Sequence, residues 1–171
     1  MKRIILGCVI ALASFTAPLF AGEKCVALMA SSPQAGGNEA STFSVTQILD
    51  IELTAMFPKS AANKLIGLHV AEIRIYTPKH SLYQSISLPF SADAKRKGEK
   101  HRLQNYPELV PLRVLRDLSG SGKPYLGLTA SLPVAGTPIL MNSMYGTWSA
   151  EAFLDGEPFA CSPSVKFAIN Q

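Results

Sequence analysis

Histidines and a short glycine- and serine-rich run are the residues whose types could support catalysis or ligand binding. His69, His80 and His101 are scattered, without the His-x-x-x-His spacing that places two metal ligands on one helix face. The run 120–123 ends like a phosphate-binding loop, but Pro124 follows where a serine or threonine would hold magnesium. These patterns predict no catalytic residue, no metal and no cofactor.

A concentration of positive charge lies in the middle of the chain. Lys95, Arg96 and Lys97 open a basic run that continues to Arg102. Such a run attracts anionic partners, so it is a candidate for weak contact with anionic lipid headgroups or acidic glycans. The alternative is a solvated surface loop, since no set of aromatic side chains accompanies the charges.

The first twenty-one residues have the composition of a secretory signal. Two basic residues precede an uncharged stretch over 4–22, and Ala21 supplies a small residue before the expected cleavage point. We therefore predict a signal peptide over 1–21 and a periplasmic or extracellular mature protein. The alternatives are an uncleaved membrane anchor and a lipoprotein signal that ends at Cys8.

Signal cleavage changes the charge balance. Two basic residues leave with the signal, so the formal net charge falls from +4 to +2. Because the mature chain is then nearly neutral, the isoelectric point of about 9.0 does not indicate nucleic-acid binding. Beyond residue 22 no apolar run is long enough to span a bilayer. We expect no nucleic-acid partner and no transmembrane span after cleavage.

Cys25 and Cys161 are the cysteines of the expected mature chain. In an oxidising compartment two cysteines most simply form one disulfide, here closing a loop of about 135 residues. A loop of that size stabilises a fold by roughly 4–5 kcal/mol in the chain-entropy model. We predict a structural bond, because a redox pair usually has Cys-x-x-Cys spacing. Two unpaired thiols or an intermolecular bridge are the alternatives.

Alternation of apolar and polar residues predicts a domain built from strands. Residues 49–57 alternate throughout, which indicates a strand with one buried face. Similar runs, bounded by turn residues, cover 69–77, 82–90, 110–114, 126–132, 146–154 and 165–169. Small polar residues dominate before them, so we predict a flexible N-terminal segment over 22–46 and the folded domain over 47–171.

About seven strands separated by turns predict an all-β protein, an antiparallel two-layer sandwich, with a closed barrel as the alternative. The alternation also assigns side chains to faces. Trp148 is in phase with Ala150 and Ala152, which predicts a core position. We expect Ile51, Ile73 and Leu128 to share that interior.

Three aromatic residues fall on faces predicted to point outward: Tyr76, Tyr83 and Phe153. Outward aromatic rings can form a binding patch, although single exposed rings are common in strands. Together with the three basic residues at 95–97, they are the candidate partner surface.

The segment from Tyr145 to Gly156 resembles the penultimate strand and hairpin turn of bacterial exported immunoglobulin-like domains. A Gly-x-Trp step leads an alternating strand into an Asp-Gly turn, and Tyr145 lies where a corner tyrosine is often found. The resemblance implies an immunoglobulin-like sandwich, with Cys25 and Cys161 outside the positions of the usual cysteine pair. It implies no activity, because this fold carries many unrelated functions.

We expect a non-catalytic cell-envelope or secreted protein that binds a protein or surface component. The alternatives are an enzyme whose loops assemble His69, His101 and Asp117, and a structural subunit of an envelope assembly joined by edge strands. The identity of the partner is not readable from the residues.

Overall fold

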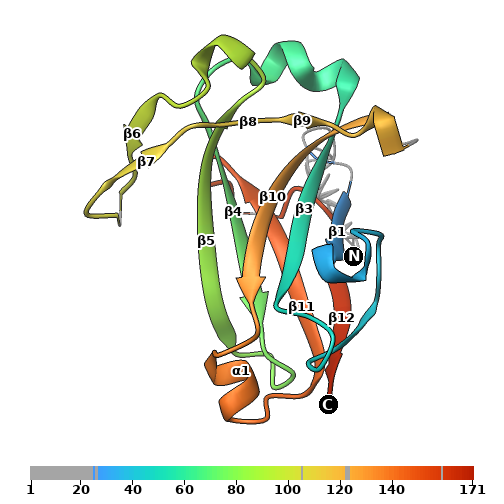
Figure 1. Ribbon diagram of the computed structural model, residues 1–171. Helices are drawn as coiled ribbons and strands as arrows, with labels where there is room; N and C mark the ends of the chain where they lie inside the picture. Colours follow the sequence, from blue (N-terminus) through green and yellow to red (C-terminus); the bar gives the residue numbers. More distant parts are fainter. Residues whose placement is uncertain (1–24, 26, 105, 122–123, 159) are drawn as a thin grey trace, which may run out of the picture.

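The computed structural model describes residue 25 and residues 27–104, 106–121, 124–158 and 160–171 (Figure 1). Over these residues the protein is all-β, with two large sheets and one two-stranded hairpin. The predicted signal peptide over 1–21 lies outside the described residues. Among the residues described, no helix combines the length and the apolar character needed to cross a bilayer.

The smaller of the two large sheets has four strands and is antiparallel throughout, in the order β1-β3-β10-β9. Its strands are β1 (Ala27–Ser31), β3 (Asp50–Pro58), β10 (Tyr125–Pro133) and β9 (Arg116–Asp117). β3 and β10 pair along their whole length and are the two central strands of this sheet.

The larger sheet has the order β2-β12-β11-β4-β5-β8. Its strands are β2 (Thr42–Ser44), β12 (Val165–Asn170), β11 (Gly146–Leu154), β4 (His69–Tyr76), β5 (Leu82–Ser91) and β8 (Arg113–Val114). The inner pairs are antiparallel, including the β4–β5 hairpin, whereas β2 and β8 each join an outer strand in parallel.

The remaining elements are short. A separate hairpin is formed by β6 (Lys100–Arg102) and β7 (Leu109–Pro111). The helical turns are η1 (Pro33–Ala35), η2 (Lys59–Leu65), η3 (Ala94–Arg96), η4 (Ser119–Ser121) and α1 (Pro138–Met141). In Figure 1, η2, η3, β8 and β9 lie at the upper end and α1 at the lower end.

A single core unites the two large sheets. Ile51 and Leu128 from one sheet and Ile73 and Trp148 from the other belong to one buried cluster, as predicted. The Trp148 Nε1 donates to the carbonyl oxygen of Met144 at 3.0 Å, which satisfies the one polar atom of this ring. Because the two sheets have separate strand orders, the described strands do not close into one barrel.

The segment predicted as a flexible N-terminal extension is instead built into both sheets where the structure describes it. β1 pairs with β3, and β2 pairs with β12 at the far edge of the other sheet. Leu28, Ala30 and Phe43 are buried in the shared core. The prediction was wrong because short edge strands draw their stability from neighbours distant in sequence rather than from local propensity.

The strand predicted over 110–114 is divided between two sheets. β7 pairs with β6, β8 pairs with β5, and β9 then joins β10 in the opposite sheet. This crossing segment is anchored by Leu112, Leu115 and Leu118, all buried. Period-two alternation misread it, because every third residue faces the protein along a segment that crosses between sheets.

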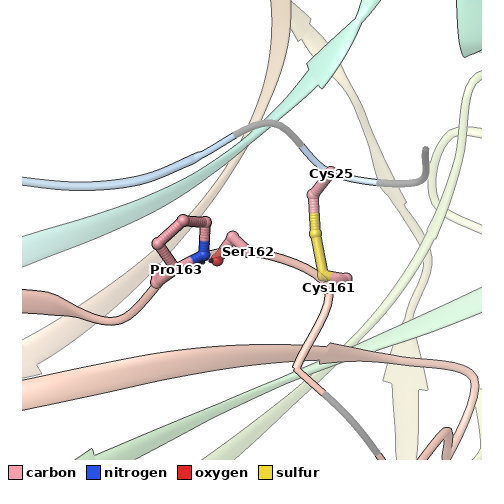
Figure 2. The surroundings of a disulfide bond; sticks show 4 residues. All are labelled: Cys25, Cys161, Ser162 and Pro163. Atoms are coloured by element: carbon pink, nitrogen blue, oxygen red, sulfur yellow. Dashed lines mark hydrogen bonds between the residues drawn. A yellow bond between two sulfur atoms is a disulfide. The ribbon is translucent and has the colours of Figure 1, made fainter. Parts of the chain in front are cut away.

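The predicted disulfide joins Cys25, just before β1, to Cys161 in the connection between β11 and β12. The two Cα atoms are 5.3 Å apart across a sequence separation of 136. Figure 2 shows the bond beside Ser162 and Pro163. The Cys161 backbone N–H also donates to the carbonyl oxygen of Ala152 at 2.8 Å, so the disulfide ties the N-terminal strand to β11.

Candidate binding surface

The outward face of β4 carries an ion pair that extends to β5. Arg74 donates from Nε and Nη2 to the two carboxylate oxygens of Glu72, at 2.9 and 3.0 Å. Ser85 Oγ donates to the same carboxylate at 2.6 Å. The Arg74 hydrogen bond lowers the pKa of Glu72 and raises the pKa of Arg74 in turn. Both groups are therefore ionised at neutral pH, and their charges cancel within this face.

Two of the predicted outward aromatic residues lie on this face, but they do not present free rings. The Tyr76 hydroxyl donates to Glu151 Oε2 at 3.3 Å, and partial burial, followed by the Glu151 charge, raises the pKa of Tyr76. Phe153 is only 5% exposed. The guanidinium Cζ of Arg74 lies 4.0 Å from its ring centroid and covers it in a cation–π contact.

Tyr83, the third predicted member of this patch, faces the core instead. The pairing of β4 with β5 shifts register between Ile75 and Tyr76, and such a bulge reverses the phase of the strand beyond it. The Tyr83 ring packs edge-on against Trp148 with centroids 5.1 Å apart. Leu82, the residue before Tyr83, is 56% exposed. The three aromatic residues therefore do not form one surface.

The predicted basic residues follow β5 at the upper end of the domain. The Asp93 carboxylate accepts from the Lys95 backbone N–H at 2.9 Å and so begins the turn η3. Arg96 pairs with Glu99 at 2.8 Å, which lowers the pKa of Glu99 and raises the pKa of Arg96. Lys95 and Lys97 are exposed. Lys95 also lies at an open depression of about 380 Å³ between η2 and η3.

We call residues 94–111 the basic arm; position 105 lies outside the described residues. The arm contains five lysine or arginine residues and two glutamates, a formal net charge of +3. Its hairpin β6–β7 projects to the side of β5 in Figure 1. Lys100 and Arg102 are exposed on β6, and buried Leu112 fixes the base of the arm. The arm therefore carries positive charge beside one edge of the larger sheet.

That edge is formed by β5, whose outer side is largely unpaired. β8 pairs only with Phe90 and Ser91, and no other described strand pairs with this side of β5. The Ser87 backbone N–H donates to the Tyr106 hydroxyl oxygen at 3.2 Å, so Ser87 directs its backbone away from β4. Pro89 points the same way, at a position where a proline removes no donor from the pairing with β4.

The β5 edge also lacks the charges that usually protect an exposed edge. Residues 81–92 contain no lysine, arginine, aspartate or glutamate. Natural sheets commonly place such charges on edge strands to prevent pairing with other chains. This combination was missed in the sequence, although an uncharged run containing Pro89 was a usable signal of an edge strand.

The three residues expected for a loop-assembled catalytic site each bind a different partner. His69 Nδ1 lies 2.9 Å from Asp155 Oδ2, and His101 Nε2 lies 3.3 Å from Glu99. Asp117 accepts from Lys59 at 2.8 Å, and this bond, with one from the Ser119 backbone, lowers its pKa to about 2. The described contacts join no two of the three residues. Over the same part of the chain, no group of three potential ligands could hold a metal ion.

The paired His69 has a structural role that sequence reasoning did not assign. The second oxygen of Asp155 accepts from the Val70 backbone N–H at 2.9 Å, and the Asp155 N–H donates to the Val70 carbonyl at 2.8 Å. Asp155 has a positive φ of 53°, which an aspartate tolerates better than most residues. These bonds fasten the turn after β11 to the start of β4.

No protein-family model matches this chain, and no curated protein matches it. The choice of function therefore depends on the surface geometry described above.

Proposed function

We propose that this chain is a non-catalytic exported protein of the cell envelope or the extracellular space that binds a protein or surface component. The observation that carries this proposal is the uncharged edge of β5 beside the basic arm. An edge strand presents backbone donors and acceptors that favour pairing with another chain. Since this edge has no protecting charge, we assign the partner-binding surface to it and to the arm.

Export is part of the same proposal. The composition of residues 1–21 supports a cleaved secretory signal. The disulfide between Cys25 and Cys161 supports an oxidising compartment, because cytosolic thiols are kept reduced.

We also propose that the domain is immunoglobulin-like. The order β1-β3-β10-β9 corresponds to strands A-B-E-D of that fold, and β12-β11-β4-β5 corresponds to G-F-C-C′. Two features differ from antibody domains: Trp148 lies on the F-like strand, and the disulfide does not join the B- and F-like strands. The fold supplies a stable support for edge recognition and specifies no partner.

A capture experiment tests the binding function. The disulfide-bonded mature chain is immobilised and cross-linked to envelope extract, beside the arm variant Lys95→Gln/Lys97→Gln. The matched control, Lys79→Gln/Lys166→Gln, removes two exposed lysines outside the arm. A partner captured by the native chain and the control, and reduced in the arm variant, supports the proposal. Capture of nothing above background, or catalytic turnover by the purified chain, would contradict it.

A further inference from the structure

We propose that the β5 edge accepts an extended segment of a partner protein as an added strand, and that this segment carries acidic residues next to the part that pairs. The inference rests on the proposed binding function and names the mode of recognition and the chemistry of the partner. Strand addition obtains affinity from main-chain hydrogen bonds and specificity from the side chains beside them.

Strand addition requires backbone N–H and C=O groups that point away from β4, and β5 provides them. Because Ser87 and Ser91 direct backbone groups away from β4, Ser85 between β4-facing neighbours does the same. The unpaired stretch ends at Pro89, and β8 pairs with the next two residues, Phe90 and Ser91. An incoming strand therefore has a defined site beside residues 84–88.

Tyr106 occupies this site in a way that a partner can replace. Its hydroxyl oxygen accepts the hydrogen bond from the Ser87 N–H, where the carbonyl of an added strand would accept it. The exchange leaves the Ser87 donor satisfied, and the freed phenol regains hydrogen bonds from water. Tyr106 therefore covers the edge in the free protein without blocking it permanently.

The side chains along the edge favour an uncharged pairing segment. Ser85 and Ser87 are small, and Ser85 already donates to Glu72 on the outward face. Ile86 is partly buried against the core and offers an apolar neighbour on the other face. β-branched residues fit such a pleated, half-buried surface best.

The acidic requirement comes from the basic arm. Lys97, Lys100 and Arg102 are exposed, and no ion pair joins them to the described acidic residues. The arm lies beside the same side of β5, since its Tyr106 reaches Ser87. Carboxylates flanking the added strand would meet this charge, raising the association rate and fixing the register.

A second copy of this chain fits the edge less well than an acidic partner. Antiparallel pairing of two β5 strands would bring the turn that bears Lys79 in one copy toward the basic arm of the other. Lys79 is exposed in that turn, so charges of the same sign would face each other. Charge complementarity thus favours a different protein.

Two peptides probe the site directly. One alternates threonine and valine and ends in a tetraglutamate tail, and its twin carries a tetralysine tail. Fluorescence anisotropy at low ionic strength should show the acidic peptide binding roughly tenfold or more tightly than the basic one. Amide hydrogen exchange should show new protection at Ser85 and Ser87 on binding. Protection at another strand instead, or equal affinity for both tails, would overturn the proposal.

Variants separate the edge from the arm. Ser85→Pro removes an N–H that faces away from β4, and we expect at least a roughly tenfold loss of affinity for the acidic peptide. Lys100→Glu should weaken it roughly threefold, whereas the control Lys166→Glu on β12 should leave it unchanged. If Ser85→Pro does not fold, the Lys100→Glu comparison and the exchange pattern of the native chain still decide the outcome.

Other occupants give distinct results. A dimer in size-exclusion chromatography that Ser85→Pro abolishes would assign the edge to a second copy. Binding of anionic lipid vesicles without peptide binding would assign the arm to a membrane. Either outcome rejects strand addition by an acidic protein. If a partner from envelope extract is captured equally by native and Ser85→Pro chains, the binding function stands and the β5 site is wrong. Failure of both peptide binding and extract capture rejects the site and the function together.

Discussion

The ring of Tyr83 meets the ring of Trp148 edge-on, at 5.1 Å between centroids and 84° between planes. The contact exists because the β4–β5 bulge turns Tyr83 inward and leaves Leu82 56% exposed. One irregularity in pairing thus decides which of two adjacent residues belongs to the core.

Tyr83→Ala should therefore destabilise the protein far more than Leu82→Ala. Loss of a large ring packed on a buried tryptophan should cost about 2–3 kcal/mol, whereas truncation of an exposed leucine should change stability by less than about 0.5 kcal/mol. Urea denaturation of the disulfide-bonded chains, followed by tryptophan fluorescence, measures both values. Equal effects of the two changes would contradict the packing of Tyr83 against the core.

Gly127 leaves room for Leu118 to pack on the outer face of the smaller sheet. A Cβ at Gly127 would lie 2.9 Å from Leu118 Cδ1 and 3.1 Å from Thr54 Cγ2. Gly127→Ala should cost about 1–2 kcal/mol by overpacking, measured by thermal or urea unfolding. Gly120→Ala, where nothing lies within 4 Å of the added Cβ, is the control. Adding Leu118→Ala should reduce the effect of Gly127→Ala, and strict additivity would argue against this contact.

Asp155 should be important for stability through its bonds to the start of β4. Asp155→Ala removes the acceptor for His69 and Val70 at a positive φ, so we expect a loss of about 2–3 kcal/mol. Asp155→Asn tolerates the same φ and keeps an acceptor oxygen for Val70, so it should lose less. Chemical denaturation at neutral pH ranks the two variants, and a larger loss in the asparagine variant would contradict this role.

The ion pair with Lys59 predicts that the Asp117 carboxyl group titrates at an unusually acidic pH. The folded pKa of Asp117 is lowered from 3.8 to about 2, chiefly by the Lys59 hydrogen bond. A lowered carboxyl pKa stabilises the fold above the unfolded value, so this contribution is present above pH 3.8 and disappears as the pH falls through about 2. Carboxyl carbon NMR should find that midpoint. In Lys59→Met it should move toward 3.8, and an unmoved midpoint would exclude Lys59 as the main cause.

The disulfide should be a large part of the stability of this domain. Cys25→Ala/Cys161→Ala removes a cross-link across 136 residues, and the chain-entropy model gives a loss of about 4–5 kcal/mol. Guanidinium unfolding of this double variant measures the loss. The native chain with its disulfide reduced should be as stable as the double variant. If the reduced native chain is more stable than the variant, the alanine substitutions destabilise the fold by more than the loss of the cross-link.

The residues alone determined much of the strand content. Alternation places a strand over 146–154, and the structure has β11 with these same bounds and Trp148 fully buried. This prediction succeeds because a long strand with one buried face repeats every second residue, independent of its neighbours. The pairing of Cys25 with Cys161 was equally accessible, since the two cysteines that follow the predicted signal peptide have one simple intramolecular pairing.

Tertiary structure alone decided which strands lie at the sheet edges and which residues of β5 face the core. The residues of β1 and β2 look like a loose leader until β3 and β12 supply partners for their backbone groups. Tyr83 turns inward only because β4 and β5 pair with a bulge, and a bulge is a property of two strands together. The outer side of β5 is open because of the order of strands in the sheet. Local periodicity does not encode this order, because the periodicity shows which face a side chain occupies and not which strand lies beside it.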